Sequence, residues 1–130
     1  MNQRATPWIF INQGECRTGD IVFGRDLEAA CQALHQGGLA AAEVSGEGKI
    51  WSIICPHPPL IAQFSAFAPY NAILVELIED PRIRLIGNLV AAVDQPINSV
   101  SLDRAVIGDR VRVVFQDEAD DWVMPRWELC

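Results

Sequence analysis

The chain has 130 residues, half of them hydrophobic, and its 17 acidic residues outnumber 10 basic ones to give a formal net charge of −7. This length and composition suffice for a folded domain with its own apolar core and exclude an intrinsically disordered chain. The acidic balance argues against nucleic-acid and anionic-membrane binding, because contacts between phosphates and Lys or Arg supply most of the affinity for nucleic acids.

The sequence contains no run of apolar residues long enough for a transmembrane helix, and residues 1–7 lead into no apolar segment of signal-peptide length, so we expect neither feature. We therefore expect a cytoplasmic protein, in which the cysteines stay reduced thiols. The four cysteines are Cys16, Cys31, Cys55 and Cys130, and no two of them form a C-x-x-C pair. A complete zinc or redox motif of that kind is absent from the sequence.

Residues 1–44 form an N-terminal arm in which we predict one helix, over residues 26–36. Asp26 is a suitable N-cap, and Gly37 and Gly38 follow the last apolar residue, as is typical of a helix end. One apolar stripe has the spacing of a helix face and consists of Leu27, Ala30, Cys31 and Leu34. Such a helix needs a surface to pack on, either the rest of this chain or another chain.

Residues 45–130 form a body with five predicted strands, over residues 49–55, 70–79, 82–91, 110–116 and 122–128. Pro81 predicts a tight hairpin turn between the second and third strands. Gly87 breaks the alternation of the third strand and predicts a bulge or a sharp bend. In the longer connection, residues 92–109, a helical turn is expected near residues 101–104. This pattern predicts a mainly β fold, a five-stranded OB-fold Greek-key barrel with an N-terminal helical arm.

The alternation within the strands predicts which side chains face the core. In the second strand Ile73, Val75 and Leu77 share one face. In the fourth strand Val111, Val113 and Phe115 are expected to point inward, whereas Arg110 and Arg112 point outward.

Three groups of residues could carry chemistry, and for each we favour a structural role. Cys31 and His35 are four apart on the predicted helix and with Cys16 would supply three metal ligands, but a fourth is missing. Cys55 and His57 could be a nucleophile and a base, but no third group that would orient the base is evident among the surrounding prolines. The acidic turn 117–121 lacks the spacing of a calcium loop. We assign no catalytic residue.

The loop over residues 58–69 carries four large apolar side chains, those of Leu60, Ile61, Phe64 and Phe67. Loops normally run over the surface, so we expect these apolar side chains to be buried against another surface, of this chain or of a partner. The loop could fold over its own barrel as a lid, or it could dock on a partner, because exposed apolar patches mark interaction sites.

The order and spacing of several segments in residues 44–128 resemble the acyl-CoA-associated OB-fold family. The segments are Val44-Ser45-Gly46-Glu47-Gly48, Pro69-Tyr70, Val75-Glu76-Leu77, Gly87-Asn88-Leu89-Val90, Ile107-Gly108-Asp109-Arg110-Val111, Val114-Phe115 and Met124-Pro125-Arg126-Trp127. The resemblance implies an accessory subunit for a thiolase-like enzyme: a thiolase, a hydroxymethylglutaryl-CoA synthase-type enzyme, or a retro-aldolase acting on steroid side-chain CoA thioesters. The partner would then carry the catalytic residues.

Members of this family usually carry a rubredoxin-like zinc ribbon before the barrel, and this chain departs from that pattern. Cys31 and Cys16 stand where one cysteine of each pair would fall, but Leu34 and Gly19 occupy the positions of their partners. Tetrahedral zinc needs four ligands. The departure predicts a degenerate ribbon without zinc, or a helical replacement for it, and no other cofactor is expected.

The resemblance and the residues together predict a non-catalytic subunit that docks on a thiolase-superfamily protein, stabilises it and shapes its substrate channel. The expected contacts with the partner or with acyl-CoA are His57, Leu60, Ile61, Phe64, Phe67 and Tyr70. The sequence leaves open whether the chain forms a homodimer. The alternative is a single-stranded nucleic-acid-binding OB-fold protein in which tryptophans stack on bases, and the net charge speaks against it.

Overall fold

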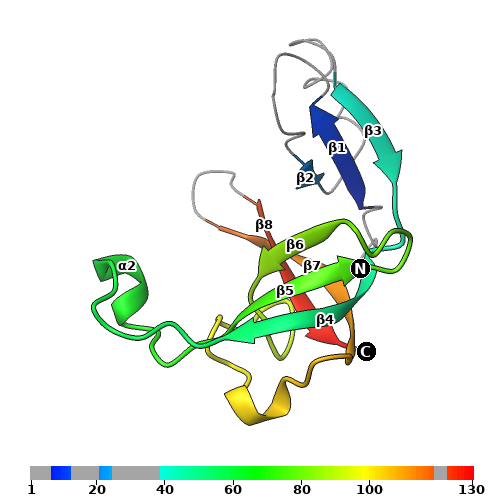
Figure 1. Cartoon of the computed structure of the whole chain (residues 1–130). Coiled ribbons are helices and arrows are strands. Elements are labelled where there is room, and N and C mark those ends of the chain that lie inside the picture. Colours follow the sequence, from blue (N-terminus) through cyan, green and yellow to red (C-terminus); the bar gives the residue numbers. More distant parts are fainter. Residues whose placement is uncertain (1–6, 13–20, 25–38, 119–122) are drawn as a thin grey trace. The chain divides into compact units, whose positions relative to one another are not determined.

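The computed structural model of the chain describes residues 7–12, 21–24, 39–118 and 123–130. The chain divides into two compact units, Met1–Gly46 and Glu47–Cys130. Each unit contains its own β-sheet (Figure 1).

The described part of the first unit is an antiparallel sheet of three short strands, which the sequence pattern did not predict. The strands are β1 (Trp8–Asn12), β2 (Ile21–Gly24) and β3 (Leu39–Glu43), and β1 lies between the other two. In β3, the sequence Leu-Ala-Ala-Ala-Glu favours a helix by propensity, but pairing of the whole strand with β1 makes it extended. The helix predicted over residues 26–36 lies outside the described residues.

The second unit is a curled sheet of five antiparallel strands. The strands are β4 (Glu47–Ile54), β5 (Ala72–Leu77), β6 (Arg84–Gly87), β7 (Arg110–Asp117) and β8 (Val123–Leu129). They lie in the order β6-β5-β4-β7-β8. Each predicted strand of the body overlaps one of these strands, and the predicted mainly β OB fold is confirmed.

The two edge strands of this sheet are linked just beyond the end of β6. Leu89 and Trp127 form an isolated parallel bridge. The amide of Val90 donates to the carbonyl of Trp127 at 2.7 Å, and the amide of Trp127 donates to the carbonyl of Asn88 at 3.0 Å. These bonds use backbone groups that an open sheet would leave unpaired at its edges, so the sheet curls into a barrel-like form.

The core lies on the inner face of this curled sheet. The predicted inward side chains of β5, Ile73, Val75 and Leu77, are all buried. In β7 Val111 is buried, whereas Val113 and Phe115 are only half-buried, and Arg110 and Arg112 are exposed as expected. Burying one such aliphatic side chain contributes about 1.5–3 kcal/mol. The other large apolar side chains that are fully buried in this core are Ile50, Leu89, Val90 and Trp127.

Gly87 ends β6 where the backbone passes against an aromatic ring. A Cβ atom at this position would lie 2.7 Å from Cδ1 and Nε1 of Trp127, closer than any side chain can fit. Of the bulge or sharp bend predicted at Gly87, the bulge is not found, because the pairing of β6 with β5 keeps its register there; the register of this sheet shifts in β4, between Ile50 and Ser52. Gly87 is therefore required by close packing.

The connection between β6 and β7 contains a single 3-10 turn, Leu102–Arg104, at the predicted helical turn. The β5–β6 hairpin turns at Asp80, whose carboxylate accepts bonds from the amide, Nε and Nη2 of Arg82 at 3.0, 3.0 and 2.9 Å. Hydrogen bonds from the Arg82 side chain, and then from its amide, lower the pKa of Asp80.

Candidate functional site

The segment that joins β4 to β5, residues 55–71, is called the β4–β5 loop below, and it stands away from the sheet (Figure 1). It contains one short helix, α2 (Ala62–Ser65), in which no residue is buried. The exposed fraction is 63% for Ile61 and 38% for both Phe64 and Phe67. Leu60 is half-buried and His57 is exposed. In this arrangement the loop does not close over its own barrel.

Short-range hydrogen bonds shape the loop. The carbonyl of Ile61 accepts bonds from the amides of Phe64 and Ser65, at 3.0 and 3.1 Å, and the amide of Phe67 donates to the carbonyl of Phe64 at 3.0 Å. At the base of the loop Tyr70 is buried, and its ring centroid lies 6.0 Å from that of Phe64. Tyr70 thus anchors the loop to the rest of the second unit, whereas Ile61, Phe64 and Phe67 keep part of their side chains exposed.

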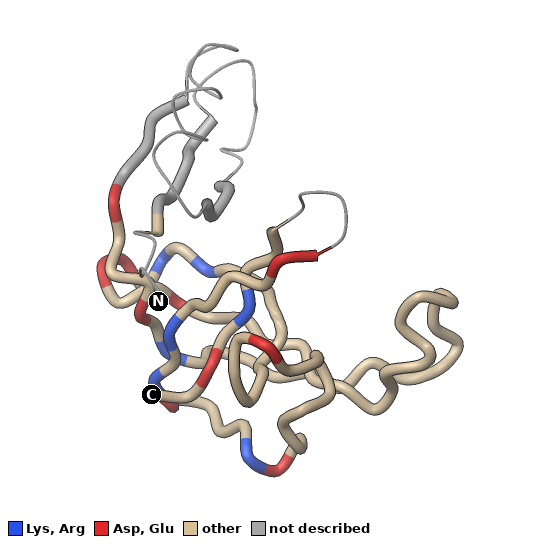
Figure 2. The backbone as a smooth tube through the Cα atoms, turned by 180° about the vertical axis from the view of Figure 1, so that it is seen from behind, with Lys and Arg blue, Asp and Glu red and all other residues tan. Residues whose placement is uncertain are grey.

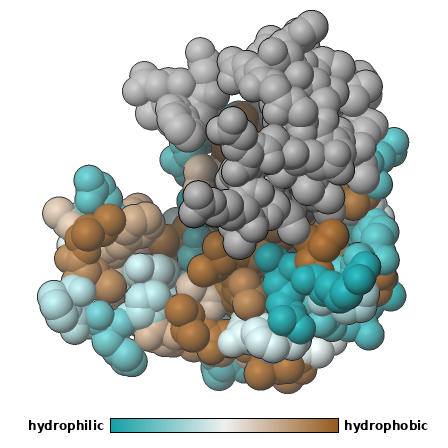
Figure 3. Space-filling view, turned by 45° about the horizontal axis from the view of Figure 1, so that its top comes forward, coloured by the Kyte–Doolittle hydropathy of each residue, from teal (hydrophilic) through white to brown (hydrophobic). Residues whose placement is uncertain are grey.

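The loop carries no strongly charged residue. No Asp, Glu, Lys or Arg occurs between Lys49 and Glu76, and Figure 2 shows the projecting loop without any charged position. In the space-filling view hydrophobic surface gathers on the loop and on the neighbouring part of the second unit (Figure 3). Protein interfaces are depleted of charge at their centres and enriched in aromatic residues, so the composition of this loop suits a contact surface.

The end of the loop is fixed by Asn71, a polar side chain with no exposed surface. Its Oδ1 accepts a hydrogen bond from the amide of Leu89 at 2.6 Å, and its Nδ2 donates to the carbonyl of Leu89 at 3.0 Å. Nδ2 of Asn88 donates to the carbonyl of Asn71 at 2.6 Å. These bonds satisfy the buried amide and join the base of the loop to the segment that follows β6.

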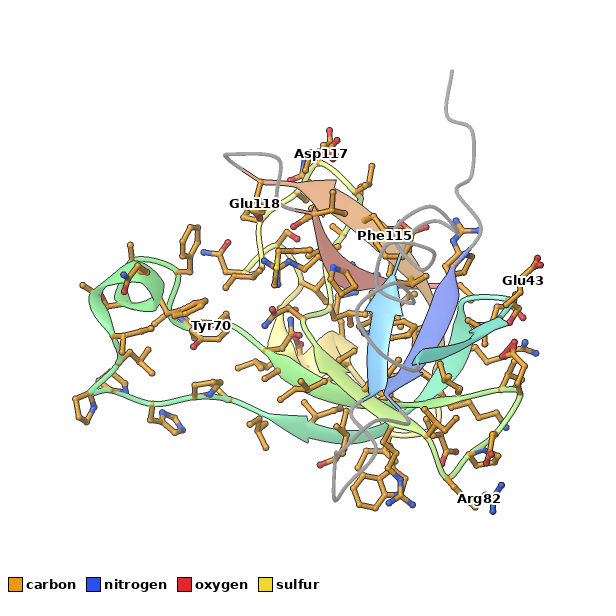
Figure 4. The ribbon with its side chains drawn as sticks, turned by 90° about the horizontal axis from the view of Figure 1, so that it is seen from above. Glu43, Tyr70, Arg82, Phe115, Asp117 and Glu118 are labelled. Carbon is orange, nitrogen blue, oxygen red and sulfur yellow. The ribbon has the colours of Figure 1, made fainter. Side chains whose placement is uncertain are left out.

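A groove of about 600 Å³ lies beside the loop, and we call it the acidic groove. Its volume is in the range of sites that hold small molecules. The loop forms one wall, and the β6–β7 connection and the β7–β8 hairpin form the others (Figure 4). It is lined by Phe64, Phe67, Val93, Asp94, Gln95, Pro96, Ile97, Gln116, Asp117, Glu118, Met124 and Arg126.

Three carboxylates and one guanidinium line this groove, and the guanidinium is already engaged. Nε of Arg126 donates to Oε1 of Gln116 at 3.0 Å, and Nη1 donates to Oδ1 of Asn88 at 2.9 Å. Nη2 of Arg126 lies 3.6 Å from Oε1 of Glu118. Burial lowers the pKa of Arg126, and the Glu118 charge opposes this shift. Because three carboxylates face one guanidinium, the groove as a whole is anionic.

The structure shows no hydrogen bond between Cys55 and His57, the pair considered for catalysis. Cys55 is half-buried with Sγ 3.9 Å from the carbonyl of Pro56, whereas His57 is exposed. In the part of the chain that the structure describes, no three His, Cys, Asp or Glu residues are grouped to hold a metal ion. The predicted ligand positions Cys16, Cys31 and His35 lie outside that part. Within it, no helix combines the length and hydrophobicity needed to cross a membrane.

The loop side of the acidic groove is evident in the sequence, whereas its opposite wall is not. That wall comes from residues 93–97, 116–118, 124 and 126, which are brought together only by folding. In OB folds, ligands bind beside the loops that join the first two and the last two strands. This rule would have indicated that the turn between β7 and β8 lines the same site as the β4–β5 loop. The sequence of the turn between β7 and β8 indicates by itself only an acidic turn without the spacing of a calcium loop.

Comparison with known proteins places most of the second unit in one family. The family model described as the ChsH2 C-terminal OB-fold domain matches residues 41–116. The solved structure of the Ltp2-ChsH2(DUF35) aldolase is similar, with a TM-score of 0.60 and 25% identity over 94% of this chain and 83% of that chain. No curated protein matches the chain.

Proposed function

Because the chain belongs to the family of ChsH2 C-terminal OB-fold domains, we propose that it is a non-catalytic accessory subunit of an enzyme complex that acts on acyl-CoA thioesters. The similar solved structure is an aldolase with two named components, Ltp2 and ChsH2(DUF35). A two-component relative supports a role in which this chain works together with a second polypeptide.

The observation that carries the proposal is the exposed, uncharged β4–β5 loop. Ile61, Phe64 and Phe67 project from a loop that has no charged residue to keep it solvated. Exposed apolar patches of this kind mark interaction sites in soluble proteins. Covering these side chains would contribute favourable free energy at about 25 cal/mol per Å² of apolar surface removed from water.

We take the partner to be a thiolase-superfamily protein, as the family resemblance implies, and the partner to hold the catalytic residues. This chain would dock on it, stabilise it and shape its substrate channel. We assign it no zinc and no catalytic residue, and we place it in the cytoplasm. Nucleic-acid binding, which the fold would allow, is disfavoured by the net charge of −7 and by the carboxylates that line the acidic groove.

The experiment is co-purification of the intact, tagged chain from its native host, with identification of the proteins that travel with it by mass spectrometry. We expect a thiolase-superfamily protein. Recovery of the chain alone, or with unrelated proteins, would contradict the proposal. Zinc analysis of the same sample tests the degenerate ribbon, since one zinc per chain, as a structural site holds, would show an intact metal centre.

A further inference from the structure

We propose that the acidic groove receives a segment of the partner protein in which a Lys or Arg stands next to a large apolar side chain. The inference rests on the proposed function, because it specifies the chemistry of the partner at one site. It goes further in stating that the groove excludes the phosphate-bearing end of CoA.

The walls of the groove are complementary to an apolar side chain. Four of the side chains that line it, Phe64, Phe67, Val93 and Met124, are large, apolar and exposed to solvent. They come from three segments that line the same hollow, the β4–β5 loop, the β6–β7 connection and β8. An apolar side chain inserted among them would remove surface of both proteins from water.

The charges of the groove are complementary to a cation that lies beside that apolar side chain. Asp94, Asp117 and Glu118 line it, and the single basic residue, Arg126, already donates to Gln116 and Asn88 and lies near Glu118. Covering the groove with a partner excludes water, which strengthens the interaction between a carboxylate and an incoming ammonium or guanidinium. Complementary charges of this kind select the partner and fix its register.

The same charges disfavour the other occupants that could be considered. The phosphates of CoA would be repelled by the three carboxylates. A second copy of the chain carries a net charge of −7 itself, and an anionic lipid surface would be repelled for the same reason. A basic, apolar protein segment combines the two properties that the groove complements.

The test compares two variants that change the net charge equally. Asp94→Lys/Glu118→Lys reverses charges in the groove, whereas Glu79→Lys/Asp103→Lys reverses two exposed carboxylates elsewhere in the second unit. The affinity of each full-length variant for the co-purified partner is measured at low and high salt. We expect the groove variant to bind at least about tenfold more weakly at low salt, and the control to bind nearly as the wild-type chain does.

Glu118→Lys also removes the carboxylate that lies near Arg126, so a loss of binding could come from misfolding. A second groove variant therefore replaces carboxylates with uncharged amides. Asp94→Asn/Asp117→Asn keeps the size of both side chains and should weaken binding in the same direction, with a reduced salt dependence. Urea unfolding of every variant verifies the fold.

The outcomes separate this inference from the proposed function. If the wild-type chain binds a thiolase-type partner and both groove variants bind it as tightly as the control, the inference is wrong and the proposed function stands. If octanoyl-CoA binds the isolated chain and competes with the partner, the inference is equally overturned. If the wild-type chain recovers no partner, both proposals fail together.

Discussion

The side chain of Asn71 binds the backbone of Leu89 as a neighbouring strand would, accepting from its amide at 2.6 Å and donating to its carbonyl at 3.0 Å. Leu89 in turn forms the bridge to Trp127. One buried amide therefore connects the base of the β4–β5 loop to the place where the two edges of the curled sheet meet.

Replacing Asn71 with Ala should destabilise the second unit. The change leaves the amide and carbonyl of Leu89 buried without these partners, and each unsatisfied group costs about 1–3 kcal/mol. We expect the free energy of unfolding in urea to fall by about 2–4 kcal/mol. The exposed Asn98 is the control, and Asn98→Ala should have little effect. Equal midpoints for the two variants would show that the paired bonds do not stabilise the fold.

Gly87→Ala should cost about 1–3 kcal/mol through overpacking, because the new Cβ would lie 2.7 Å from the indole ring of Trp127. It should also change the near-UV circular dichroism of the tryptophans. Gly108→Ala is the comparison: its Cβ would meet no atom within 4 Å, but Gly108 has a φ of +97°. That substitution should cost about 1 kcal/mol of strain and leave the near-UV spectrum unchanged. A Gly87→Ala protein with wild-type stability and spectrum would refute the close packing.

The hairpin turn should make stability depend on pH through Asp80. Hydrogen bonds from Arg82 lower the pKa of Asp80 in the folded chain. A lowered folded-state pKa stabilises the fold above the unfolded-state value, about 3.9 for Asp, and the contribution is lost as the pH falls through the folded-state pKa. Asp80→Asn and Arg82→Gln should each lower the urea midpoint slightly at neutral pH. Differences from wild type that stay constant into strong acid would contradict this origin.

Changes in the β4–β5 loop should separate binding from stability. Phe64→Ser/Phe67→Ser alters two exposed side chains of the loop, and Val106→Ser/Ile107→Ser alters two exposed side chains outside it. The control should keep its free energy of unfolding to within about 0.5 kcal/mol, and the loop variant should lose only about 1 kcal/mol, because Phe64 gives up its ring contact with Tyr70. Only the loop variant should lose the partner in co-purification. Loss of the partner in both variants, or in neither, would show that the loop has no special role.

The strands of the body were predictable because their signal is local. Alternating Ile73, Val75 and Leu77 identify an inward face without knowledge of any neighbour, and Pro81 marks the hairpin. The alanine-rich β3 was missed because its intrinsic preference is helical, and only the pairing with β1 makes it a strand.

Only one side of the candidate site could be predicted, because only that side has a local signal in the sequence. Exposed apolar residues in one loop, such as Phe64 and Phe67, can be found in a sequence window. The opposite wall could not, because Asp94, Glu118 and Met124 meet only after the sheet has curled. Asn71 could have been singled out from the sequence, since a single amide side chain just before an apolar strand needs hydrogen-bond partners when it is buried.

The most direct test of the central claim is hydrogen–deuterium exchange of the amides of residues 61–67, measured in the free chain and in the complex with its co-purified partner. A partner that covers the β4–β5 loop should slow exchange there by on the order of tenfold or more and leave the turn at residues 105–108 unchanged. Exchange in the loop that is equally fast in the free chain and in a fully formed complex would show that the partner binds elsewhere.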